Sequence, residues 1–143
     1  MNNSIFVFLF FLFAGFSLTA QKTNPVSWDF KLEKVSSDEY KLVATAFIAP
    51  MWALYSQFTD PEGPVPTSFI VNGQEVRFTE ESKAIREIDK IFEVEVQHFK
   101  NQAVFSTLVS KSKGDSLKGS VEFMTCDGLK CLPPTKVLFD LKF

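Results

Sequence analysis

The chain has 143 residues, two cysteines, one histidine and a formal net charge of −2, which is the length of a single domain. This near-neutral charge argues against nucleic-acid binding and gives no sign of attraction to a membrane surface. Two cysteines and one histidine are too few ligands for a zinc site, so we expect no metal and no other cofactor.

The first twenty residues have the composition of a targeting segment. Ile5–Leu18 is almost unbroken apolar sequence, and the small residue Ala20 follows at a plausible cleavage point. An apolar run of about 14 residues is short for a helix that spans a bilayer, so we interpret residues 1–20 as a signal peptide. No Lys or Arg precedes the run, which leaves an uncleaved membrane anchor open. Membrane association is expected only in that case.

Cleavage leaves one domain, residues 21–143, which is long enough to form a hydrophobic core without disulfide support. Export places this domain in the periplasm or another extracytoplasmic space, where a disulfide persists. The two cysteines are therefore not needed to hold the fold together, and their role has to be sought elsewhere.

The domain alternates apolar and polar residues in the period-2 pattern of half-buried strands. Strands are expected at 26–33, 40–48, 52–55, 68–71, 75–78, 92–99, 103–109, 117–125 and 137–143. Asn72-Gly73 is the strongest short hairpin signal, and the charged segment 80–90 is expected to form one or two helical turns or an extended loop. Short strands separated by frequent turns predict an all-β, immunoglobulin-like antiparallel β-sandwich.

The only two cysteines, Cys126 and Cys131, enclose an Asp-Gly turn and precede Pro133-Pro134. Gly128 permits the positive φ of a tight turn, and a hairpin brings the two Cα atoms within the roughly 4.4–6.8 Å that a disulfide needs. Closing so short a loop contributes only on the order of 2 kcal/mol, which favours a redox role. From the spacing alone, a structural bridge stays open and is the commoner use of such a pair.

The remaining motifs carry no obvious chemistry. His98 lies within an alternating strand pattern and is interpreted as a surface or edge histidine without a role. Most phenylalanines after residue 20 fall on alternating strand positions, so we expect them to pack in the core. A binding site for an apolar ligand at Trp52, Tyr55 and Phe92 is the less favoured use of these aromatic residues.

Several stretches of the chain resemble the amino-terminal periplasmic domain of the bacterial thiol:disulfide interchange protein DsbD. They are Pro25–Trp28, Tyr40–Ala46, Trp52–Gln57, Gly63–Thr67, Ile91–Val96 and Cys126–Pro134. Together they extend over nearly the whole domain, and the Cys-Leu-Pro-Pro ending at Cys131–Pro134 is the most specific of them. The resemblance implies an immunoglobulin-like sandwich that carries a redox-active cysteine pair on one hairpin.

The resemblance also implies a function in thiol-disulfide exchange, as a protein-disulfide reductase or interchange component. Such a domain receives electrons from a membrane reductant transporter and passes them to thioredoxin-like protein domains. Cys131 matches the cysteine that forms mixed disulfides with partners, and Cys126 matches the resolving cysteine. The alternative is a secreted interaction module without catalytic activity, in which the disulfide only staples a hairpin.

A further stretch, Asp89–Glu93, resembles the family's cap loop. Phe92, between Ile91 and Glu93, matches the aromatic residue that covers the disulfide until a partner docks, and Tyr55 matches an aromatic residue that lines the same end. We expect Pro133 and Pro134 to end the hairpin pairing, where they either expose a flat apolar docking patch or merely stop a strand.

The chain departs from the family in three respects. The best-known members have one more residue between the two cysteines. Glu93 stands where a glycine is common in the cap loop, which changes the expected mobility of the cap. The printed chain ends at Phe143 without a membrane or thioredoxin-like domain, so we expect it to receive electrons from a separate protein, as a stand-alone copy of the domain.

Overall fold

The computed structural model describes residues 24–111 and 114–143, so the signal-peptide interpretation of residues 1–20 falls outside it. The described elements are strands: β1 (Val26–Lys34), β2 (Glu39–Ile48), β3 (Ala53–Tyr55), β4 (Ser68–Val71), β5 (Gln74–Val76), β6 (Thr79–Glu80), β7 (Ile85–Ile88), β8 (Glu95–Phe99), β9 (Gln102–Ser110), β10 (Ser116–Cys126) and β11 (Cys131–Lys142). Within the described ranges, no helix has the length and apolarity needed to cross a membrane. The all-β prediction is confirmed.

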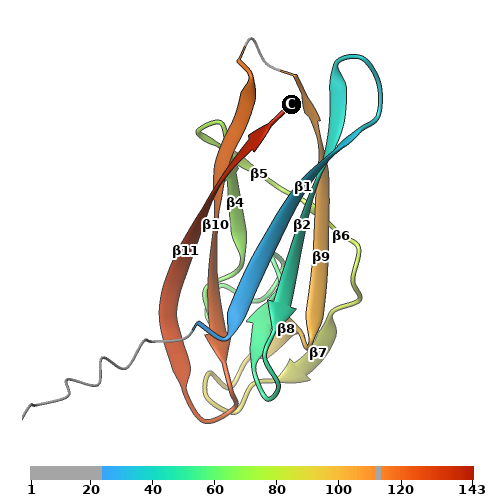
Figure 1. The fold of residues 1–143 in the computed structure, drawn as a ribbon. Helices are drawn as coiled ribbons and strands as arrows, with labels where there is room; N and C mark the ends of the chain where they lie inside the picture. The colour runs from blue at the N-terminus through green and yellow to red at the C-terminus, as the bar shows by residue number, and fades with distance from the viewer. Residues whose placement is uncertain (1–23, 112–113) are drawn as a thin grey trace, which may run out of the picture.

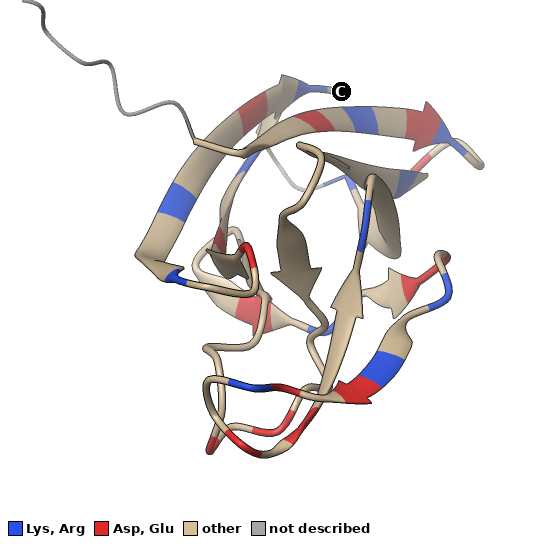
Figure 2. Ribbon diagram, turned by 90° about the horizontal axis from the view of Figure 1, so that it is seen from below, with Lys and Arg blue, Asp and Glu red and all other residues tan. Residues whose placement is uncertain are grey.

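The strands form two antiparallel sheets that pack as a sandwich (Figure 1). The first sheet has the order β1-β2-β9-β6, and the second has the order β5-β4-β10-β3-β8-β7, with β11 paired to the other side of β10. Viewed end-on, the strands of both sheets surround a common interior (Figure 2). The hairpin that joins β10 to β11 lies at one end of this sandwich, next to the hairpin of β7 and β8 (Figure 1).

The interior is built mainly from aromatic side chains contributed by both sheets. The ring of Trp28 on β1 lies within 6.0 Å, centroid to centroid, of four phenylalanine rings: Phe30, Phe69, Phe105 and Phe123. Three of these, from β4, β9 and β10, are almost fully buried. The phenylalanines on the alternating strand positions therefore pack in the core as predicted, since burial of an aromatic ring is among the largest hydrophobic contributions to a fold.

Two predicted elements differ from the observed ones. The charged segment 80–90 forms no helical turn, because residues 79–80 pair with β9 and residues 85–88 pair with β8 as an exposed edge strand. The last strand begins at Cys131 rather than at Val137, so the hairpin pairing continues through Pro133 and Pro134. Proline is tolerated there because β11 is an edge strand, paired with β10 alone among the described strands.

Candidate functional site

The two cysteines face each other directly across the end of the β10–β11 hairpin. Cys126 is the residue opposite Cys131 in the strand register, their Cα atoms lie 4.1 Å apart, and their side chains form a disulfide. The backbone N–H of Asp127 donates to the carbonyl oxygen of Lys130, 3.0 Å away, so residues 127 and 130 form a hydrogen-bonded pair. Because such pairs alternate along the ladder with pairs that lack hydrogen bonds, the neighbouring cysteines form a pair of the second kind. Pairs without hydrogen bonds are the closest ones in an antiparallel ladder, which brings the sulfur atoms within bonding reach.

The turn beyond the cysteines is held by one carboxylate. Oδ1 of Asp127 accepts hydrogen bonds from the backbone N–H groups of Leu129 and Lys130, each at 2.9 Å. The N–H of Lys130 and then that of Leu129 hold the pKa of Asp127 below its usual value. Gly128 has a φ of 88°, in the left-handed region that glycine adopts without cost. The Asp-Gly signal in the sequence therefore predicted this turn correctly.

A bulge in the hairpin decides which residues face each other at its end. Pro133 and Pro134 on β11 lie opposite the single residue Met124 on β10, and the register shifts at this point. If the register of the rest of the hairpin continued to the turn, Cys126 would face Leu132. Cys131 would then project from the other face of the strand. The prolines thus do not end the pairing as we expected from the sequence; they set the register that pairs the cysteines.

The disulfide belongs to a small hydrophobic cluster separate from the main core. Cys126 is 2% exposed and lies with Tyr55 and Val96 in the buried part of this cluster, whereas Cys131 is partly exposed. Phe92 packs against the cluster from the loop between β7 and β8, together with three other partly buried residues, Val94, Met124 and Cys131. The sulfur atom of Cys126 therefore belongs to a buried side chain, and that of Cys131 to a partly exposed one in a cluster that Phe92 also contacts.

The loop that carries Phe92 is organised by Asp89. Oδ1 of Asp89 accepts hydrogen bonds from the backbone N–H groups of Ile91, at 2.7 Å, and Phe92, at 3.1 Å. The backbone of Asp89 also donates to the carbonyl oxygen of Val94 and accepts from the N–H of Glu93. We define residues 89–94 as the cap. The structure places each predicted cap residue, Asp89, Ile91 and Phe92, in this one hairpin loop.

Tyr55 links the cap to the strand that lies beside Cys126. Its hydroxyl donates a hydrogen bond to Oδ2 of Asp89, 3.2 Å away. Ala53, two residues earlier on β3, pairs with Cys126 in the sheet. Burial, followed by the nearby Asp89 carboxylate, raises the pKa of Tyr55 above its usual value of about 10. The phenol therefore stays protonated and can act as the donor that holds the cap against the cluster.

Glu93 occupies a backbone conformation that favours glycine. Its φ is 59°, in the left-handed region, where an L-residue with a Cβ atom is strained. This gives a physical reason for the glycine that is common at this place in the family that the sequence resembles. The cap of this chain forms its left-handed turn with a residue that fits it less well than glycine would.

His98 is buried, so its interpretation as a surface or edge histidine is wrong. It is 2% exposed, its ring lies 6.3 Å from that of Tyr55, and its Nδ1 atom lies 3.6 Å from a carboxylate oxygen of Glu87. Burial lowers the pKa of His98, and the carboxylate of Glu87 opposes this shift. His98 therefore lies on the hairpin that carries the cap, with its side chain buried near Tyr55, a position that the strand alternation alone did not reveal.

The surface around the cap and the cysteine turn carries several exposed apolar side chains. Ile88 is 65% exposed, Ile91 43% and Leu129 91%, and a hollow of about 250 Å³ lies between the cap hairpin and Gly128. Loops on this end of the molecule carry acidic residues (Figure 2). In the part of the chain that the structure describes, no group of three or more His, Cys, Asp or Glu side chains is arranged to hold a metal ion.

Two solved structures share this fold. The N-terminal periplasmic domain of ScsB from Proteus mirabilis has a TM-score of 0.68 at 18% sequence identity over 87% of this chain. The DsbD N-terminal domain of Neisseria meningitidis, in the reduced form, has a TM-score of 0.59 at 18% identity over 81% of this chain. The chain spans 49% of the length of the ScsB structure and 85% of the DsbD structure.

These similarities define the class of fold: an antiparallel sandwich of the type found in DsbD N-terminal domains. No protein-family model and no curated protein sequence matches the chain. The DsbD-like resemblance drawn from the sequence is thus confirmed by the fold, with a disulfide formed by the two cysteines that the sequence singled out.

Deleting Pro134 alone is expected to leave the disulfide in place. One residue fewer on β11 removes the bulge and leaves Pro133 opposite Met124, while Cys131 stays opposite Cys126. Deleting both prolines should shift the register by one residue, so that the two cysteines project from opposite faces of the hairpin. A thiol assay on the unfolded, air-oxidised proteins should find no free thiol in the first variant and two per chain in the second. Free thiols in the single deletion, or complete disulfide formation in the double deletion, would contradict this register.

Replacing Glu93 by glycine is expected to raise the free energy of unfolding by about 1 kcal/mol, because it relieves the strain of a left-handed residue. Urea denaturation of the oxidised protein measures this change. The matched control is Lys90→Gly in the same loop, whose φ is not in the left-handed region and which should give no gain. Equal effects of the two substitutions would contradict the assignment of strain to Glu93.

Proposed function

We propose that this chain exchanges disulfides with other proteins through Cys126 and Cys131, in an extracytoplasmic compartment. The observation that carries the proposal is the unequal exposure of the two cysteines: Cys126 is sealed in the cluster, and Cys131 is partly exposed in a cluster against which Phe92 of the cap also packs. A disulfide that served only as a staple would need neither an accessible sulfur nor a cover. The fold shared with the DsbD and ScsB domains supports the same function.

The exchange begins when a donor protein docks and its thiolate attacks Sγ of Cys131. The bond between the two sulfur atoms breaks, and Cys126 leaves as a thiolate that takes up a proton. A second thiol of the donor then attacks the donor's own sulfur in the mixed disulfide and releases Cys131 as a thiol. Two electrons and two protons have passed to the chain, and the donor has become a disulfide.

The reverse sequence delivers the electrons to an acceptor. The thiolate of Cys131 attacks the disulfide of the acceptor and forms a mixed disulfide, and Cys126 resolves it by attacking Sγ of Cys131. The acceptor leaves as a dithiol, and the disulfide of the chain is restored. We propose that the donor is a thioredoxin-like domain of a membrane reductant transporter. The acceptors are other thioredoxin-like domains, in line with the DsbD-like fold.

Docking requires that the cap move, because Phe92 packs against the cluster that holds both cysteines. The exposed side chains of Ile88 and Ile91 on the cap hairpin and Leu129 on the cysteine turn offer apolar surface for this contact. Moving the cap exposes one aromatic ring and breaks the hydrogen bond between Tyr55 and Asp89, a modest cost that a docked partner can compensate. Small thiols make no such contact, so the cap limits unwanted exchange in an oxidising space.

Cys126→Ser is expected to trap a mixed disulfide through Cys131. Without the resolving thiol, a covalent complex with an oxidised thioredoxin-like protein should accumulate and appear as a reducible band on a non-reducing gel. Cys131→Ser is the matched control and should give little complex, because Cys126 is sealed. The proposal fails if Cys126→Ser forms no adduct with any thioredoxin-like protein, or if the two variants trap equally well.

Phe92→Ala is expected to speed the reduction of the native disulfide by dithiothreitol at least several-fold, because it removes the ring that packs against the cluster. Stopped-flow measurement of the reduction rate provides the test. Ile91→Ala, which truncates an exposed apolar neighbour in the same loop, should leave the rate nearly unchanged. If the rates of Phe92→Ala and the unmodified chain agree, Phe92 does not shield the disulfide.

A further inference from the structure

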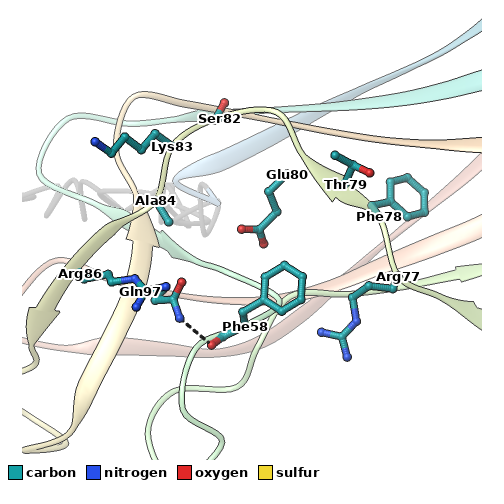
Figure 3. A pocket seen from close by; sticks show the side chains of 10 residues that line it. All are labelled: Phe58, Arg77, Phe78, Thr79, Glu80, Ser82, Lys83, Ala84, Arg86 and Gln97. Atoms are coloured by element: carbon teal, nitrogen blue, oxygen red, sulfur yellow. Dashed lines mark hydrogen bonds between the residues drawn. The ribbon is translucent and has the colours of Figure 1, made fainter.

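A second hollow, of about 700 Å³, lies where the chain crosses from β6 in one sheet to β7 in the other. Its lining includes Phe58, Arg77, Glu80, Lys83, Arg86 and Gln97, and none of these belongs to the cluster around the disulfide (Figure 3). A volume of this size is within the range of sites that bind small molecules or peptide segments. The proposed exchange reaction does not use it.

The hollow gathers both arginines of the chain. Arg77 and Arg86 are the only two in the sequence, and every other basic residue except the histidine is a lysine. Among the described residues, neither arginine forms an ion pair. A guanidinium group binds carboxylates in a fixed, two-pronged geometry that lysine cannot reproduce. The placement of both arginines at one site therefore indicates recognition of an anion.

The single acidic residue in the lining does not neutralise these cations. The carboxylate of Glu80 accepts hydrogen bonds from the hydroxyl of Ser56, at 2.9 and 3.0 Å, and from the backbone N–H of Gln57, at 2.9 Å. These neutral donors fix Glu80 in place. With Lys83, the lining carries three positive charges and one negative charge, on a chain whose formal net charge is −2. An anionic ligand is attracted to this local excess of positive charge.

The floor of the hollow is an exposed aromatic ring. Phe58 is 51% exposed, and Figure 3 shows its ring in the middle of the hollow, with Arg77 and Arg86 on opposite sides of it in this view. The guanidinium carbon of Arg77 lies 5.0 Å from the ring centroid, and Gln97 donates a hydrogen bond to the backbone oxygen of Phe58. Phe58 is thus held in position as an apolar platform between two cations.

The hollow opens beside a free strand edge. β7 is the last strand of its sheet, all four of its residues are exposed, and Arg86 in its middle lines the hollow. The outer backbone groups of such an edge can pair with an added strand. A site of this shape suits an extended peptide segment better than a compact anion, because a segment can follow the edge while its side chains enter the hollow.

We propose that this hollow and the outer edge of β7 bind an extended, acidic peptide segment of a partner protein. Carboxylates of the segment pair with Arg77 and Arg86, and an apolar side chain lies on the ring of Phe58. Because side chains two residues apart point to the same face of a strand, a segment with an acidic, an apolar and an acidic residue at every second position presents these groups to the hollow. The site is separate from the cysteines, so binding needs neither the disulfide nor the exchange reaction.

The test is the binding of a fluorescein-labelled octapeptide, Ser-Glu-Ser-Val-Ser-Glu-Ser-Val, to the oxidised protein, followed by fluorescence anisotropy. We expect saturable binding that weakens as salt is added and that becomes about tenfold weaker in Arg86→Gln. Lys118→Gln, which removes a cation that pairs with Asp140 on the opposite edge of the sheet, should bind like the unmodified chain. A peptide with lysine in place of glutamate should not bind.

The proposal would be overturned if the acidic peptide did not bind, or if Arg86→Gln bound it as tightly as the unmodified chain. It would also be overturned if succinate or sulfate displaced the labelled peptide at concentrations as low as those of unlabelled peptide, because the hollow would then be a site for small anions. A variant with both cysteines replaced by serine should bind the peptide normally. Failure of this inference therefore leaves the proposed exchange reaction untouched, and the reverse also holds.

Discussion

The direct opposition of Cys126 and Cys131 at the end of a hairpin is the constraint on which the rest of the site depends. A strand register that is shifted by one residue would place the two side chains on opposite faces. β11 has one residue more than β10 at this point, and the bulge at Pro133-Pro134 accommodates it, so the cysteines stay opposite each other. Because β11 is an edge strand, the missing N–H groups of the prolines cost the sheet little. The residues that look like a strand stop in the sequence are therefore the bulge that keeps the cysteine pair in register.

The cap is coupled to this disulfide through the sheet rather than through sequence neighbours. Cys126 pairs with Ala53 at the start of β3, Tyr55 at the end of β3 pairs with His98 on β8, and β8 pairs with the strand that leads into the cap. The hydroxyl of Tyr55 then reaches Asp89. The carboxylate of Asp89 thus accepts hydrogen bonds from the buried Tyr55 and from the backbone of the cap loop that carries Phe92.

Local patterns predicted most of the strands and the cysteine turn, because alternation and Asp-Gly chemistry act over a few residues. The same patterns failed where distant parts of the chain decide the outcome. Residues 80 and 85–88 of the charged segment are strand because β9 and β8 offer pairing partners, and β11 passes through two prolines because it is an edge. The burial of His98 on β8 depends on packing against distant residues such as Tyr55. The joint placement of Arg77 and Arg86 also depends on the crossover between sheets, although their rarity was visible in the sequence.

The central claim is that the Cys126–Cys131 disulfide exchanges with other proteins and is not a permanent staple. The most direct measurement is its reduction potential, obtained by equilibrium titration with dithiothreitol and counting of thiols. Exchange with thioredoxin-like partners predicts a value near theirs, roughly −180 to −270 mV. A disulfide that resists reduction until the potential falls below about −300 mV would behave as structural bridges do and would contradict the account.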